Sequence, residues 1–74
     1  MVINNFIKRL QTASHRGSDV VELRVRNEVR NQKQNFQDVE DILRRFEIIA
    51  EKAEKAGLDG EFIYDIAYEE AYSL

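Results

Sequence analysis

The sequence predicts an all-α or mainly α fold of three to four helices that ends in a C-terminal αα-hairpin. Three observations predict it. Apolar residues recur three and four residues apart through the stretch 36–56, acid-before-base pairs stand four residues apart beside them, and Pro is absent. An apolar stripe at this spacing is typical of a helix that buries one side. Seventy-four residues predict a single small domain, 1–74.

The first expected helix spans about residues 2–14. Its apolar residues, which recur at helical spacing, are Ile3, Phe6, Ile7 and Leu10. Gly17 is a natural stop signal, because helices commonly end at a glycine. Ser18 or Asp19 could then cap the element that follows.

The segment after Gly17 is compatible with two structures. Val21, Leu23 and Val25 alternate with charged residues, and this period of two with β-branched side chains favours a strand. The pair Glu22 and Arg26 favours a helix instead, and a lone strand has nothing to pair with in a helical monomer. We therefore expect a helix at about 19–31 in a monomer. The alternative is an α+β fold with one strand at 20–26, paired across a dimer.

The stretch 27–37 contains six Asn or Gln residues in eleven positions. It has few apolar residues to bury, so we expect a solvated connector or a frayed helix end. Asn35 is a reasonable capping residue for a central helix at about 36–56, and Gly57 is the corresponding stop signal.

The last expected helix spans about 60–73 and follows the central helix after about three residues. Asp59 fits the N-cap position of this helix. Leu58 and Ile63 stand on either side of it, at the positions of a hydrophobic staple. A connection this short predicts a tight hairpin of two antiparallel helices.

Composition restricts how the fold is stabilised. The chain has no Cys, so a disulfide or a thiolate metal site cannot supplement a small core. We therefore expect a homodimer, in which a second copy completes the apolar packing. No apolar run reaches transmembrane length, and the first ten residues lack the order of a signal peptide. These features predict a cytoplasmic protein that does not enter a membrane.

The sequence gives no sign of an enzyme. His15 is the only histidine and stands at an expected helix end, where a lone His usually caps backbone carbonyls. The three glycines are scattered singly, so no phosphate-binding loop is present. Glu61, Asp65 and Glu69 could bind Mg²⁺ or Ca²⁺ weakly, but such a ridge is more often solvated charge. We expect no catalytic residue, no metal and no cofactor.

Charge is distributed unevenly along the chain. Residues 1–33 carry a net charge of +4 and residues 34–74 carry −7. The end of the chain from residue 56 holds five acids and no base. Like charges four residues apart, and acids at a helix C-terminus, both weaken a helix. A helix that tolerates both penalties suggests a role beyond stability.

We therefore expect a small non-enzymatic interaction or regulatory module, inhibitor- or adaptor-like, of the kind found in phages or plasmids. Tyrosine suits such an interface, because it combines a large apolar ring with a polar tip. The last helix would present its acids and tyrosines to a protein with a basic surface, and Ile48 would add an apolar anchor or dimer contact. The expected partner-binding residues are Glu61, Tyr64, Asp65, Tyr68, Glu69, Tyr72 and Ile48.

The alternative function is a small dimeric DNA-binding regulator that uses the segment 24–37. Read as a strand before two helices, this part of the chain resembles ribbon-helix-helix repressors, in which paired strands read the DNA major groove. It departs from them by an extra N-terminal helix, a longer central helix and a connector of about six residues. The expected nucleic-acid contacts are Arg24, Arg26, Arg30 and Lys33.

Overall fold

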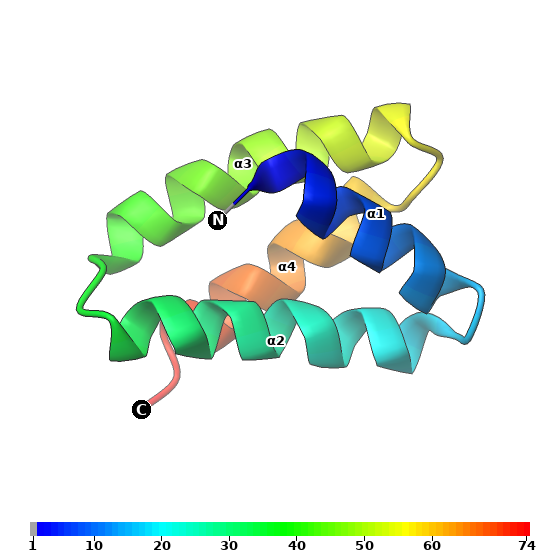
Figure 1. Ribbon diagram of the computed structural model, residues 1–74. Coiled ribbons are helices and arrows are strands. Elements are labelled where there is room, and N and C mark those ends of the chain that lie inside the picture. The colour runs from blue at the N-terminus through cyan, green and yellow to red at the C-terminus, as the bar shows by residue number, and fades with distance from the viewer. Residues whose placement is uncertain (1) are drawn as a thin grey trace.

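The computed structural model describes residues 2–74 and contains four α-helices (Figure 1). They are α1 (Ile3–Ser14), α2 (Ser18–Gln34), α3 (Val39–Lys55) and α4 (Gly60–Ala71). Residues 2–74 form no strand, so the all-α prediction with a C-terminal αα-hairpin is confirmed. The α+β alternative is wrong.

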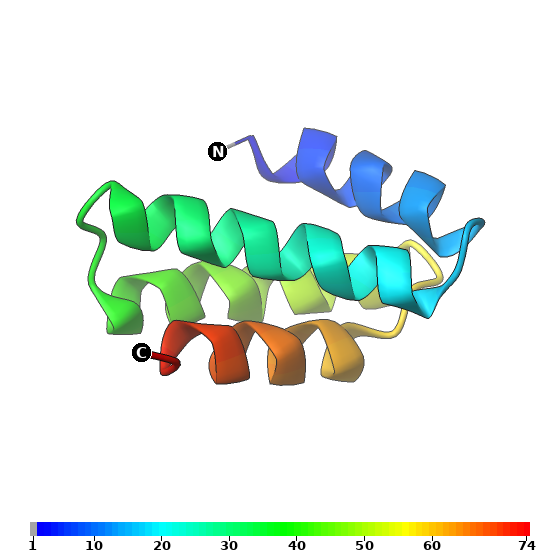
Figure 2. The same cartoon turned by 90° about the horizontal axis from the view of Figure 1, so that it is seen from below.

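The helices are stacked in three levels, as Figure 2 shows most clearly. The long helices α2 and α3 form the middle level, α1 lies on one side of them, and α4 lies on the other. Helix α4 packs closely on both α2 and α3. The side of the molecule that carries α1 and the side that carries α4 therefore face away from each other.

The helix expected at about 19–31 is confirmed as α2, which extends to Gln34. The strand alternative at 20–26 is wrong, and the first part of 27–37 is helix rather than a solvated connector. The buried side of α2 consists of Val21, Val25, Val29 and Gln32, which follow a helical period. The alternating pattern was misleading because Leu23 is exposed to solvent rather than buried. Since the segment is helical as far as Gln34, the paired strand of the ribbon-helix-helix resemblance does not exist here.

The turn between α2 and α3 moves the start of the central helix from the predicted residue 36 to Val39. Asn35 ends α2 instead of capping α3. Phe36 follows in a left-handed conformation, with φ of 62°, and its side chain is 94% exposed. The Gln37 backbone N–H closes the turn by donating to the Gln32 carbonyl at 3.1 Å. Phe36, the residue directly after the C-cap, thus occupies the left-handed position where glycine is usually found.

The α3–α4 hairpin forms as predicted. Gly57 has a φ of 85°, and the Leu58 N–H donates to the Ala53 carbonyl at 2.8 Å, which closes a Schellman motif. Asp59 caps α4, because its side chain accepts a hydrogen bond from the Phe62 N–H at 3.1 Å. These local signals bring α4 back along α3.

One apolar cluster joins all four helices. The rings of Phe6 on α1 and Phe46 on α3 meet edge to face, with centroids 6.0 Å apart. Val25 and Ile63 bring α2 and α4 into the same cluster. The remaining buried apolar residues are Ile7, Leu10, Ala13, Val21, Val29, Ile42, Leu43, Ile49, Ala53, Ile66, Ala67 and Ala71.

Candidate interaction surfaces

Three tyrosine rings run along α4 on the side that faces away from α2. The centroids of Tyr64 and Tyr68 are 6.4 Å apart, and those of Tyr68 and Tyr72 are 4.8 Å apart. Tyr64 is partly buried against the core, and this burial, with the negative charge of Glu47, raises the pKa of its hydroxyl. Tyr68 and Tyr72 are 51% and 57% exposed. The predicted row therefore has one structural ring and two accessible ones.

The predicted acidic row divides in the same way. Glu61 and Asp65 are exposed, and neither forms an ion pair within residues 2–74. Glu69 is exposed too, but it accepts a hydrogen bond from Arg26 Nη2 at 2.9 Å. We call Glu61, Asp65, Tyr68 and Tyr72 the α4 outer face. In this part of the predicted site, the carboxylates form no ion pair within residues 2–74 and the rings stay exposed.

A buried carboxylate, absent from the sequence-based site, holds the end of α4 to α2. Glu70 is only 6% exposed, and it accepts hydrogen bonds from Arg26 Nη1 at 3.1 Å and Arg30 Nε at 3.0 Å. These arginines and Ser73 lower the pKa of the Glu70 carboxyl against the opposing effect of burial, the bond from Arg30 having the largest effect. The ionised form of Glu70 is therefore part of the folded structure.

Lys33 completes this junction at the C-terminus of α4. Its Nζ donates to the carbonyl oxygens of Glu70 at 3.2 Å and Ser73 at 2.7 Å. A cation at this end of a helix also offsets the partial negative charge of the helix dipole. Bases of α2 thus offset the negative charges of Glu69 and Glu70 at the end of α4. The expectation that these two acids destabilise the helix end without compensation is therefore wrong.

The four basic residues of the DNA-binding alternative do not share one surface. Arg26, Arg30 and Lys33 stand on the ridge of α2 that contacts α4, and they bind its last turn. Hydrogen bonds to Glu69, Glu22 and Glu70 raise the pKa of Arg26 above its ordinary value. Arg24 stands on another ridge of α2, which lines a pocket shared with α1. Within residues 2–74, Arg24 is thus the member of the set that makes no bond to α4, and its side chain is half-buried rather than outward-facing.

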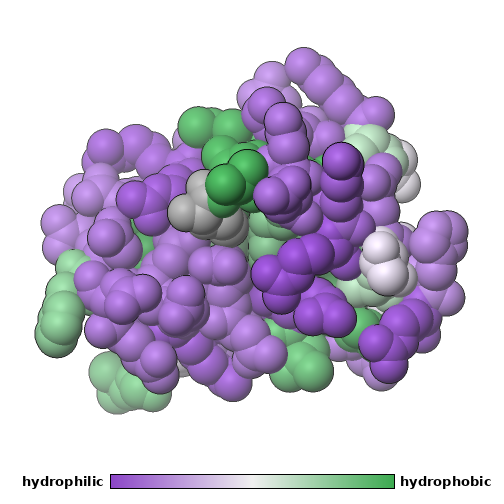
Figure 3. All heavy atoms as spheres, in the orientation of Figure 1, coloured by the Kyte–Doolittle hydropathy of each residue, from purple (hydrophilic) through white to green (hydrophobic). Residues whose placement is uncertain are grey.

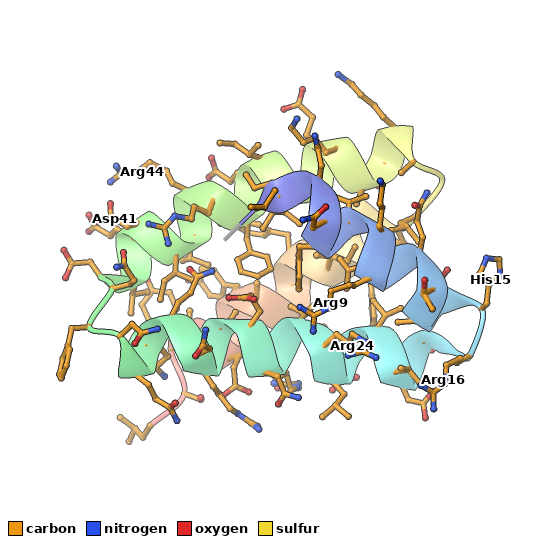
Figure 4. The ribbon with its side chains drawn as sticks, viewed as in Figure 1. Arg9, His15, Arg16, Arg24, Asp41 and Arg44 are labelled. Atoms are coloured by element: carbon orange, nitrogen blue, oxygen red, sulfur yellow. The ribbon has the colours of Figure 1, made fainter. Side chains whose placement is uncertain are left out.

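Ile48 is 47% exposed on α3. On the helical wheel it lies opposite Phe46, which is fully buried in the core. It belongs to the charged outer side of α3, where Asp41 and Arg44 form an exposed pair at 3.3 Å (Figure 4). Ile48 is thus an isolated apolar residue among charges and not an extension of the α4 outer face.

The other predicted positions add no chemical site. His15 is exposed just after the end of α1 (Figure 4). No group of three or more His, Asp or Glu side chains within residues 2–74 is arranged to hold a metal ion. Over the same residues, no helix has the length and apolar character needed to cross a bilayer.

Two buried polar residues could have been found from spacing. Glu70 follows Ile63, Ile66 and Ala67 at intervals of seven, four and three residues, so it continues the apolar stripe of α4. Gln32 follows Val25 and Val29 in the same way on α2. A carboxylate or amide on an apolar stripe signals a buried polar contact, since an unpaired buried charge is costly.

Comparisons of the chain with protein-family models, curated proteins and solved structures give no match.

Proposed function

We propose that this protein is a non-enzymatic interaction module, inhibitor- or adaptor-like, that uses the α4 outer face to bind a partner protein with a basic surface. A small phage- or plasmid-type regulator acting in the cytoplasm fits this role. The observation that carries the proposal is the contrast along α4. Glu69 and Glu70 are paired with α2, while Glu61 and Asp65, beside two half-exposed rings, form no ion pair within residues 2–74.

The chemistry of this face suits a basic partner. Unpaired carboxylates steer a positively charged surface during encounter and increase the rate of association. Tyrosine rings supply the apolar contact area that charges alone lack, and they are enriched among residues that dominate binding energy. Arginine fits both groups, because its guanidinium can pair with a carboxylate and stack on a ring.

The size of the α4 outer face determines whether its complex with a partner is stable or transient. Twelve residues of α4 extend for about 18 Å, which is short for a stable interface. Glu47 on α3 lies close enough to influence Tyr64, so α3 enlarges the acidic surface on one side. We therefore expect a transient complex whose affinity falls as salt increases.

The test is a pull-down with the tagged protein from cells of its natural source, using matched charge variants. The Glu61→Gln and Asp65→Gln pair removes the two unpaired acids. The Glu40→Gln and Glu51→Gln pair removes the same charge from the exposed side of α3. We expect the first pair to lose the captured partner and the second to keep it. Equal capture by both variants would reject the α4 outer face as the binding surface.

Homodimer formation is a separate part of the proposal. It rests on the exposed apolar side chains that the single chain leaves outside its core, of which Ile48 and Leu23 are on the long helices. Because α2 is helical, no strand pairing contributes to it. The dimer would bury these side chains without using the α4 outer face.

A further inference from the structure

A polar groove lies on the opposite side of the molecule from α4, between α1, the second half of α2 and the start of α3. It has a volume of about 670 Å³. A smaller pocket of about 230 Å³ adjoins it and shares Phe6, Arg9, Glu28 and Asn31 with it. Hydrophilic residues cover most of this side of the molecule (Figure 3). The groove is therefore suited to a polar ligand.

Two arginines line the smaller pocket at one end of the groove. Arg9 belongs to α1 and Arg24 to α2, and Figure 4 shows the two side chains close to each other between these helices. Within residues 2–74, neither forms an ion pair. The Nε atom of Arg24 is buried and has no hydrogen-bond partner there. Glu28 lines the same pocket, so two guanidinium groups stand there against one carboxylate. This excess of positive charge, with a buried donor that has no partner, indicates a place for an anion.

Amide side chains are held in place at the other end. Gln32 is 5% exposed, donates to Glu28 Oε2 at 3.2 Å, and accepts from Arg45 Nη1 at 3.1 Å. Arg45 Nη2 also donates to Gln37 Oε1 at 3.1 Å. These bonds fix the orientation of the groups that line the groove. A preorganised polar surface of this kind loses little entropy when a ligand binds.

The combination of arginines at one end of the groove and amides at the other favours some anionic ligands over others. Side-chain amides both donate and accept hydrogen bonds, as do the edges of nucleobases and the hydroxyls of ribose. Carboxylates only accept, so an acidic peptide side chain could bind the amide N–H groups of Asn5, Asn31 and Asn35 but not their oxygens. Arginine is, with lysine, a leading side chain in phosphate contacts, and asparagine and glutamine pair with the edge of adenine. A nucleotide therefore matches the groove better than an acidic side chain.

We propose that the groove binds a nucleotide unit, with its phosphate between Arg9 and Arg24 and its sugar and base along the amide-lined end. The unit can belong to a free mononucleotide or to a single-stranded nucleic acid. This site is independent of the proposed function, because α1 and α4 lie on opposite sides of the α2–α3 level (Figure 2). Arg26, Arg30 and Lys33 take no part in it.

The test is a titration of the ¹⁵N-labelled protein at low salt, followed by NMR. One arm uses adenosine monophosphate, a second uses a ten-nucleotide single-stranded DNA, and a third uses a polyglutamate peptide. We expect saturable shifts of the backbone amides of Arg9, Arg24, Asn31 and Gln32 with a nucleotide ligand. Shifts with the mononucleotide assign the groove to free nucleotides, whereas shifts with the strand alone assign it to nucleic acid.

Matched variants separate this site from general charge effects. Arg9→Gln with Arg24→Gln should weaken nucleotide binding by about tenfold or more, since each phosphate contact is lost along with its counterion release. Arg44→Gln with Lys55→Gln removes the same charge from the outer side of α3 and should leave affinity within about twofold. No shifts at the groove, equal weakening in both variants, or stronger binding of polyglutamate would overturn the proposal. If the first variant does not fold, the shift map of the unmodified protein decides.

Discussion

The buried carboxylate of Glu70 on α4 accepts a hydrogen bond from Arg30 Nε on α2 at 3.0 Å. Arg26 donates to the same carboxylate, and Lys33 binds the carbonyl of Glu70 itself. Three of the four bases once expected to face outward are therefore used to hold the last turn of α4. These bonds determine which charged side chains remain available to bind a partner on the α4 side and on the α1 side of the molecule.

Glu70→Ala should lower the free energy of unfolding by about 2 kcal/mol. Removing one partner of a buried ion pair leaves the other charge unpaired, and the partial exposure of Arg30 moderates that cost. Urea unfolding followed by circular dichroism measures the change. Glu69→Ala is the control, because Glu69 is 68% exposed and an exposed pair contributes less than about 1 kcal/mol. Similar effects at both positions would contradict this account of Glu70.

The stability of the protein should depend on pH through the same carboxyl. The pKa of Glu70 is lower in the folded chain than its ordinary value of 4.5, so the folded state favours the ionised form. Its contribution is fully present above that ordinary value and is lost as the pH falls toward the folded pKa. We expect the stability difference between the unmodified protein and Glu70→Gln to shrink from pH 7 to pH 3. A constant difference would exclude Glu70 from acid unfolding.

The parts of the fold that follow local rules could be predicted from the sequence. Gly57 and Asp59 define the α3–α4 hairpin through backbone and capping geometry that depends on neighbouring residues alone. For α2 the sequence predicted a helix in a monomer but left a strand open, because Leu23 completes a false alternation and only tertiary packing shows that it is exposed. The pairing of Arg30 with Glu70 joins residues forty positions apart, and no local pattern encodes it.

Phe36→Gly should raise the free energy of unfolding by about 1 kcal/mol. The left-handed backbone at Phe36 is unfavourable for a residue with a Cβ, and its exposed ring contributes little packing in return. Glycine adopts this conformation without strain and is the usual residue at this point of a helix end. Thermal unfolding measures the effect, with Asn27→Gly at an exposed position in the middle of α2 as a control that should be destabilised. A loss of stability in Phe36→Gly would show that the ring makes a contact worth more than the strain.

Ile48→Glu should convert a dimer into monomers if the outer side of α3 is the dimer contact. The residue is half-exposed among charges, so the substitution adds a charge to a seam without disturbing the core. Sedimentation equilibrium of both proteins over a range of concentrations gives their masses. A dimer that persists in Ile48→Glu would place the contact elsewhere, and Leu23→Glu would then test α2.

The most direct test of the α4 outer face is intrinsic tyrosine fluorescence during titration with the partner captured in the pull-down. The chain has no Trp, and its three tyrosines all lie at the end of the chain formed by α4. Tyr68 and Tyr72 belong to the α4 outer face, and Tyr64 is partly buried beside it, so the emission reports on α4 and the core next to it, provided that the partner's own emission is subtracted. We predict a saturable change in emission that the Glu61→Gln and Asp65→Gln pair loses and the Glu40→Gln and Glu51→Gln pair keeps. Unchanged tyrosine emission at saturating partner would contradict the central claim.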